Sequence, residues 1–99
     1  MRLTAEEAAA IRSAACETFG ADVAVRLFGS RTDDTARGGD IDLLIDVAPG
    51  HAGVAFESRF LDRLFTRIDE QKVDVVLVER GRPVPAFAAM VATHAVALP

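Results

Sequence analysis

The chain has 99 residues, of which 51% are hydrophobic, and a formal net charge of −4. This length predicts one compact domain with a single core. The negative charge excludes a protein whose whole surface binds nucleic acid, although a nucleotide remains compatible with it. The single cysteine, Cys16, excludes an internal disulfide. Because the sequence has no apolar run of membrane-spanning length and no signal peptide, we expect a cytoplasmic protein without membrane contact.

The first predicted element is an N-terminal helix. Thr4-Ala5-Glu6-Glu7 matches a capping box, in which Thr4 and Glu7 satisfy each other's backbone amides. The helix is predicted to run to about Thr18 and to end at Gly20. Its inner stripe comprises Ala8, Ile11, Ala15 and Phe19. We interpret Cys16, which flanks this stripe, as a core-edge residue rather than a nucleophile.

A Gly-Ser turn follows the first predicted strand, residues 23–28. Gly29 lets the backbone approach a ligand closely, and Ser30 offers a hydroxyl and an amide, so the pair favours a bound phosphate. Arg31 and Arg37 flank the turn. Each could contact phosphate or pair with an aspartate, and the sequence leaves both readings open.

Two carboxylates mark the start of the second predicted strand, residues 41–47. Asp40 and Asp42 are spaced i, i+2 and therefore share one face of a strand. Two like charges this close repel each other unless a cation neutralises them, and hard oxygen ligands suit Mg²⁺ or Mn²⁺. Asp46 lies on the same face, where it either extends this site or, as we favour, faces solvent. Arg26, on the preceding strand, either sits at a sheet edge or reaches a phosphate.

A third carboxylate lies in the third predicted strand, residues 73–78, which is otherwise apolar. A lone aspartate in a valine-rich run is costly without a partner. We therefore interpret Asp74 as a third metal ligand on a strand next to Asp40 and Asp42. The alternative is that Asp74 is solvated at the strand start or pairs with Lys72.

Two more helices are predicted. The first runs from residue 54 or 55 to 70, with an apolar stripe of Phe56, Phe60, Leu61, Leu64, Phe65 and Ile68. Its second stripe, Arg59, Arg63 and Arg67, is either a solvated face or a basic edge that meets phosphate or a partner. The last helix begins at Pro85 and carries a stripe that is core, partner surface or both: Phe87, Met90, Val91, His94, Ala95 and Leu98. His51, in the loop before the first of these helices, is expected to be solvated rather than catalytic.

The predicted architecture is a single α+β domain with a small mixed β-sheet of about three strands. We expect helices on one face of the sheet and the carboxylates on the other.

Three segments together resemble the nucleotidyltransferase domain of the DNA polymerase β superfamily. They are Phe-Gly-Ser-Arg at 28–31, Gly-Asp-Ile-Asp-Leu-Leu-Ile at 39–45 and Val-Asp-Val-Val at 73–76. At this length the chain looks most like the minimal nucleotidyltransferases that pair with HEPN-domain proteins in bacterial toxin–antitoxin modules. The similarity covers residues 23–78 and implies that residues 1–99 form one minimal nucleotidyltransferase domain.

The resemblance implies a role for each motif. Gly29 and Ser30, with Arg31 beside them, would hold the triphosphate of ATP. Asp40, Asp42 and Asp74 would be the catalytic residues and the ligands of two Mg²⁺ ions. The sequence departs from many relatives at Gly38-Gly39, where they carry serine or another polar residue before the first aspartate. This departure alters the loop and leaves the metal ligands in place.

The implied function is an antitoxin that transfers AMP from ATP to a hydroxyl of a partner HEPN-type toxin. An alternative is a nucleotide-binding antitoxin that neutralises its partner without catalysis. A third reading is a small α+β domain whose carboxylates are only surface charges. We do not favour an enzyme that modifies a small molecule, because such relatives carry a second, substrate-binding domain. The last helix and the arginine stripe are candidate docking surfaces, and the sequence leaves open whether the protein forms a homo-oligomer.

Overall fold

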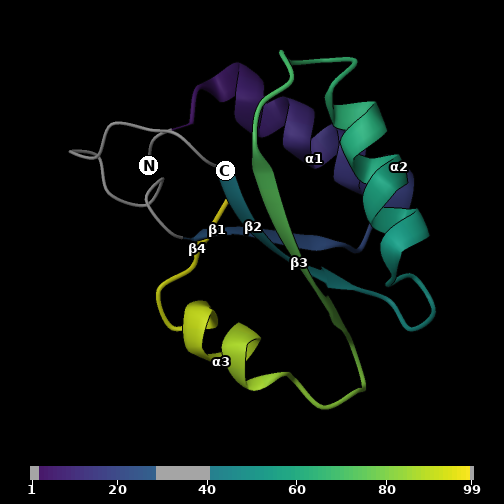
Figure 1. The fold of residues 1–99 in the computed structure, drawn as a ribbon, viewed down its shortest axis with the longest axis vertical. Coiled ribbons are helices and arrows are strands. Elements are labelled where there is room, and N and C mark those ends of the chain that lie inside the picture. Colours follow the sequence, from purple (N-terminus) through teal and green to yellow (C-terminus); the bar gives the residue numbers. More distant parts are fainter. Residues whose placement is uncertain (1–2, 29–40, 99) are drawn as a thin grey trace.

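The computed structural model describes residues 3–28 and 41–98. The described elements are α1 (Ala5–Phe19), β1 (Ala24–Phe28), β2 (Ile41–Val47), α2 (Val54–Leu64), β3 (Val73–Glu79), α3 (Ala86–Ala92) and β4 (Val96–Ala97). This arrangement confirms the predicted α+β class with a small mixed sheet (Figure 1). Within the described residues, no helix is both long and apolar enough to cross a membrane.

The strands form one sheet in the order β3-β2-β1-β4. β1 is antiparallel to both β2 and β4, whereas β2 and β3 are parallel. Parallel strands need a crossover connection, and α2 provides it. Consequently β2 and β3 begin at the same end of the sheet, and β1 ends there. This end, called the near end below, carries the candidate site.

The capping box at the start of α1 is confirmed. Thr4 Oγ1 accepts a hydrogen bond from the Glu7 amide at 3.0 Å, and Glu7 Oε1 accepts one from the Thr4 amide at 3.1 Å. The helix ends at Phe19, and Gly20 follows with φ of 106°, a conformation that L side chains rarely adopt. Cys16 is partly buried at the edge of the core, as interpreted.

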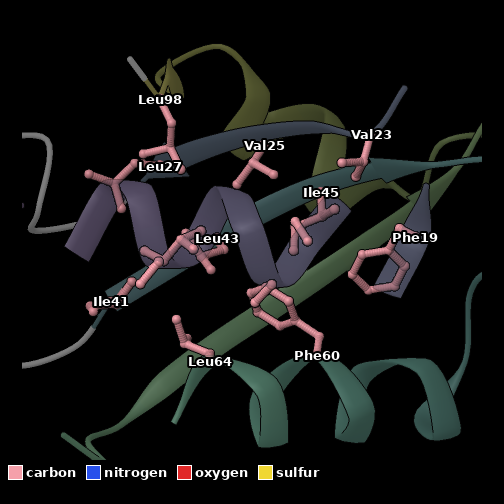
Figure 2. Packing of buried hydrophobic residues seen from close by; sticks show 14 of the residues in the cluster. Phe19, Val23, Val25, Leu27, Ile41, Leu43, Ile45, Phe60, Leu64 and Leu98 are labelled. Carbon is pink, nitrogen blue, oxygen red and sulfur yellow. The ribbon is translucent and has the colours of Figure 1, made fainter. Parts of the chain in front are cut away.

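The main core lies between the sheet and the two longer helices, α1 and α2 (Figure 2). The rings of Phe19 and Phe60 meet at 5.8 Å between centroids. In the same cluster, Ile41, Leu43 and Ile45 of β2 are fully buried. Because alternate residues of a strand face opposite sides, a slip of one residue would turn these three side chains out of the core. The core therefore fixes the register of β2.

The third helix lies against the opposite face of the sheet, an arrangement that the sequence did not predict. Ala88 of α3 is buried against Leu44 and Val78. The expectation of helices on one face holds for α1 and α2, whereas α3 shares the face of Asp42.

The C-terminal segment corrects the prediction of one helix from Pro85 to Leu98. The helix ends at Ala92, and β4 adds a fourth strand to the predicted three. The Leu98 amide donates to the Val25 carbonyl at 3.2 Å, and the Arg12 guanidinium donates to the Leu98 carbonyl at 2.9 Å. The Leu98 side chain also enters the main core. Tertiary pairing thus outweighs the helical spacing of the sequence.

The second helix is also shorter than predicted. It ends at Leu64 rather than near residue 70, although the Ile68 amide still donates to the Leu64 carbonyl at 3.1 Å. Ile68 packs partly against the core, as its place in the predicted stripe requires.

Glu79 ties together the loops at the far end of the sheet. The Gly50 amide donates to Glu79 Oε2 at 3.2 Å, and Arg82 Nε donates to the same oxygen at 2.8 Å. These donors, above all the Gly50 amide, lower the pKa of Glu79 from its ordinary value of 4.5, because they favour the charged carboxylate.

This shift predicts how the stability of a Glu79→Gln variant depends on pH. A lowered carboxyl pKa stabilises the folded protein at pH values above the ordinary pKa of 4.5. This stabilisation disappears as the pH falls through the lower pKa of the folded state. Urea unfolding across pH should therefore find the variant less stable than the native chain at neutral pH, with the two converging in acid. A difference that persists unchanged in acid would contradict this role.

Candidate active site

The described part of the predicted site consists of Asp42 and Asp74. The other predicted ligands of metal and phosphate lie outside the described residues: Gly29, Ser30, Arg31 and Asp40. Arg37, whose role the sequence left open, lies outside them too. Their predicted roles remain predictions.

Asp42 and Asp74 are paired directly across the parallel strands β2 and β3. Adjacent strands lie about 4.8 Å apart, and in-register residues point to the same face. Asp42 is partly buried and Asp74 is exposed. The sheet therefore places two carboxylates side by side on the face opposite the main core, as the sequence predicted.

Neighbouring residues determine this placement. Ile41 and Leu43 are buried in the main core, so Asp42 between them must face the other way. The Ile41 amide donates to the Lys72 carbonyl at 3.1 Å, which ties the start of β2 to the residue preceding β3. The exposure of Asp74 agrees both with a ligand at an open site and with the solvated alternative. Its register with Asp42 is what we use to propose it as a ligand.

The donor set fits a hard divalent cation. Two aligned carboxylates supply the oxygen ligands that Mg²⁺ prefers, and a bound cation would offset their mutual repulsion. Among the described residues, no group of three or more His, Cys, Asp or Glu side chains could hold a metal ion. The predicted third ligand, Asp40, lies outside them.

Asp46 belongs to a different end of the sheet. It shares the face of Asp42 but lies four residues along β2, about 13 Å away by strand geometry. Arg26 donates to Asp46 Oδ2 at 3.1 Å. The suggestion that Asp46 extends the metal site is therefore not supported, and Arg26 lies in an inner strand between β2 and β4 rather than at an edge.

The arginine stripe, which begins on α2 and continues past its end, contacts α1 through two of its three residues. Arg63 donates to the Thr18 hydroxyl at 3.0 Å and to the Glu17 carbonyl at 3.2 Å. Arg67 pairs with the Glu17 carboxylate, and Arg59 lies over the Phe56 ring at 5.5 Å. These contacts place positive charge beside the C-terminal end of α1, which has no basic residue in its last turn. They favour a structural role over a phosphate-binding edge.

His51 lies in the loop that follows β2, at the opposite end of that strand from Asp42. Its Nδ1 is 3.3 Å from the Pro49 carbonyl, and its ring centroid is 5.3 Å from that of Phe56. His51 is thus partly buried against Phe56, whereas the sequence had led us to expect a solvated side chain.

A surface hollow of about 300 Å³ lies near the start of α1. Its lining comprises Thr4, Glu6, Glu7, Arg67, Ile68, Asp69 and Gln71. Neither Asp42 nor Asp74 belongs to this lining. We place the candidate site at the paired carboxylates rather than at this hollow, because carboxylates on an open end of the sheet can hold metal-bound phosphates without a deep cavity.

Sequence reasoning assigned Phe87 to the core or to a partner surface and did not place either Phe87 or Phe28 beside the carboxylates. Phe28 is paired with Asp42 across β1 and β2, and the Phe87 ring meets Phe28 at 6.5 Å between centroids. The only sequence signal was an aromatic residue directly before the Gly-Ser turn. The contact with Phe87 depends on where α3 docks.

The family model described as "Nucleotidyltransferase domain" matches residues 9–92. The chain belongs to the nucleotidyltransferase domain family. Nucleotidyl transfer is the general activity of this family, whose substrate is a nucleotide. The match includes all the residues that carry the resemblance in the sequence. A search of curated proteins gives no match.

The aligned carboxylates predict the behaviour of an Asp42→Asn variant. It should lose Mg²⁺-dependent ATP affinity by more than the roughly 10–100-fold caused by loss of an outer-shell partner. Without metal it should remain folded, because Asp42 lies outside the buried cluster that forms the main core. Isothermal titration calorimetry with and without Mg²⁺ measures the first effect, and thermal unfolding measures the second.

Asp46→Asn is the matched control, since it changes the same residue type on the same face of the same strand. It should keep Mg²⁺-dependent ATP affinity. Equal affinity in Asp42→Asn and the native chain would show that the metal site lies elsewhere.

Proposed function

We propose that this protein is a Mg²⁺-dependent nucleotidyltransferase that transfers AMP from ATP to a hydroxyl of a partner HEPN-type toxin, and so acts as its antitoxin. The observation that carries the proposal is the in-register pair Asp42 and Asp74, on one face of the sheet in a chain of the nucleotidyltransferase domain family. The toxin and the AMP group rest on the resemblance to minimal nucleotidyltransferases.

The proposed metal ligands are Asp42, Asp74 and Asp40, which together would hold two Mg²⁺ ions. When bound, Mg²⁺ would supply positive charge to the phosphates and stabilise charge that develops during transfer. Gly29, Ser30 and Arg31 are proposed to hold the triphosphate.

The proposed reaction is an in-line substitution at the α-phosphate. The acceptor oxygen forms a bond to the α-phosphorus, while the bond from that phosphorus to the oxygen that bridges the α- and β-phosphates breaks. Pyrophosphate leaves with the electron pair of the broken bond, and Asp74 accepts the proton of the attacking hydroxyl. The exposed position of Asp74 supports this assignment, because an acceptor from another molecule can approach it.

The acceptor must be held in line with the α-phosphate, since orientation supplies a large part of such catalysis. We propose that the toxin itself provides this orientation when it docks beside β3, the edge strand that carries Asp74.

The test combines the protein, Mg²⁺ and ATP with the product of the adjacent gene, which we propose to be the HEPN-type toxin, followed by mass spectrometry of that product. We expect the toxin to gain the mass of one or more AMP groups with the native chain and with Asp46→Asn. Asp42→Asn should add none.

Two other outcomes have clear meanings. A tight complex in which the toxin never gains mass would contradict transfer and support the antitoxin that acts by binding alone. Transfer that persists in Asp42→Asn would contradict the assignment of the active site.

A further inference from the structure

Two phenylalanines lie on the face of the sheet that carries the carboxylates. Phe28 is the cross-strand partner of Asp42, and such pairs have Cβ atoms about 5 Å apart. The Phe87 ring of α3 meets the Phe28 ring at 6.5 Å between centroids, with an interplanar angle of 78°. An aromatic surface therefore begins directly beside the proposed metal site.

Phe87 does little for the core. Phe87 is 54% exposed, and α3 is anchored on the sheet by Ala88, which is 1% exposed. Met90, one helical turn further on, is 61% exposed. On the other face of the sheet, Phe19 and Phe60 are fully buried.

The orientation of the two rings keeps Phe87 open to a ligand. Since the rings are nearly perpendicular, Phe28 supports Phe87 by an edge-to-face contact and covers at most one of its faces. A flat aromatic ligand can then stack on Phe87 while Met90 borders it.

We propose that Phe87, supported by Phe28, is the stacking platform for the nucleobase of the bound triphosphate. This inference rests on the proposed function, because it requires the α-phosphate to lie at Asp42 and Asp74. The sugar and base extend from that phosphate, and the platform is the aromatic surface adjoining Asp42. Stacking on aromatic side chains accepts every base, since every base has a π-face.

The platform also predicts a pattern of base preference. Every side chain of α3, from Ala86 to Ala92, is apolar, so the helix offers no side-chain donor or acceptor to a base edge. Discrimination between nucleobases then depends on how strongly each base stacks on Phe87. Purine triphosphates should bind more tightly than pyrimidine triphosphates, with similar affinity for ATP and GTP.

The experiment measures dissociation constants for the Mg²⁺ complexes of ATP, GTP, CTP and inorganic tripolyphosphate. Phe87→Ala should weaken ATP binding about 5–150-fold, the fold-change that corresponds to stacking of one base. Phe87→Leu, which keeps an apolar side chain at the position, should show a similar loss. Tripolyphosphate affinity should be unchanged in both variants, which also shows that they remain folded.

Val54→Ala is the control, since Val54 is an 81%-exposed apolar residue on α2, which covers the opposite face. It should leave all four constants unchanged.

Three results would overturn the platform. One is unchanged ATP affinity in Phe87→Ala, and a second is equal loss of ATP and tripolyphosphate. The third is a weaker complex with the toxin at unchanged nucleotide affinity, which would make α3 a protein-docking surface. Absence of the proposed nucleotide site is distinguishable from these, because the native chain would then bind neither ATP nor tripolyphosphate with Mg²⁺. Loss of transfer alone is distinguished by the mass of the toxin, on which these binding constants do not depend.

Discussion

The parallel pairing of β2 with β3 is the constraint on which the site depends. It aligns Asp42 with Asp74 and so places two negative charges on neighbouring strands. The main core keeps them there, because a slip of β2 by one residue would expose Ile41, Leu43 and Ile45. Free energy from hydrophobic burial thus maintains the alignment of the two carboxylates, and a bound divalent cation would interact favourably with both.

The two ends of the sheet use carboxylates differently. At the far end, Asp46 pairs with Arg26, Asp22 pairs with Arg80, and Glu79 pairs with Arg82. These partly exposed ion pairs connect strands and loops, and each contributes little to stability on its own. At the near end, the sheet aligns two carboxylates with each other. Aspartate is therefore paired with arginine at one end of the sheet and aligned with a second aspartate at the other.

Much of the fold could be predicted because its signals are local. The capping box of Thr4 and Glu7 predicted the start of α1 correctly. The apolar residues of the second predicted strand, interrupted by aspartates two positions apart or more, predicted the bounds of β2, residues 41–47, correctly. The alternation of side chains along a strand placed Asp42 on the face opposite the core. The C-terminal segment could not be predicted in this way. Its apolar residues fit helical spacing, but Leu98 is held by Val25 and Arg12, which are distant in the sequence.

The site was predictable in part for similar reasons. The strand patterns of the sequence predicted that Asp42 and Asp74 lie on neighbouring strands, whereas the exact register between them depends on tertiary pairing. The contact between Phe28 and Phe87 depends on the docking of α3 against the sheet, which no local pattern specifies. The sequence also left Arg63 and Asp46 between two roles, and only their partners in the fold decide these. The predicted phosphate-binding residues Gly29 and Ser30, and the predicted ligand Asp40, remain predictions.

The central claim is that a divalent cation and a nucleotide bind where β2 and β3 begin. Replacement of Mg²⁺ by paramagnetic Mn²⁺ in the presence of ATP, observed by NMR of the backbone amides, tests it most directly. The signals of residues 41–43 and 73–75 should broaden first, while those of Asp46 and Glu79 at the far end of the sheet stay sharp. Strongest broadening at the far end, or around Glu6 and Asp69 beside the hollow, would contradict the assignment.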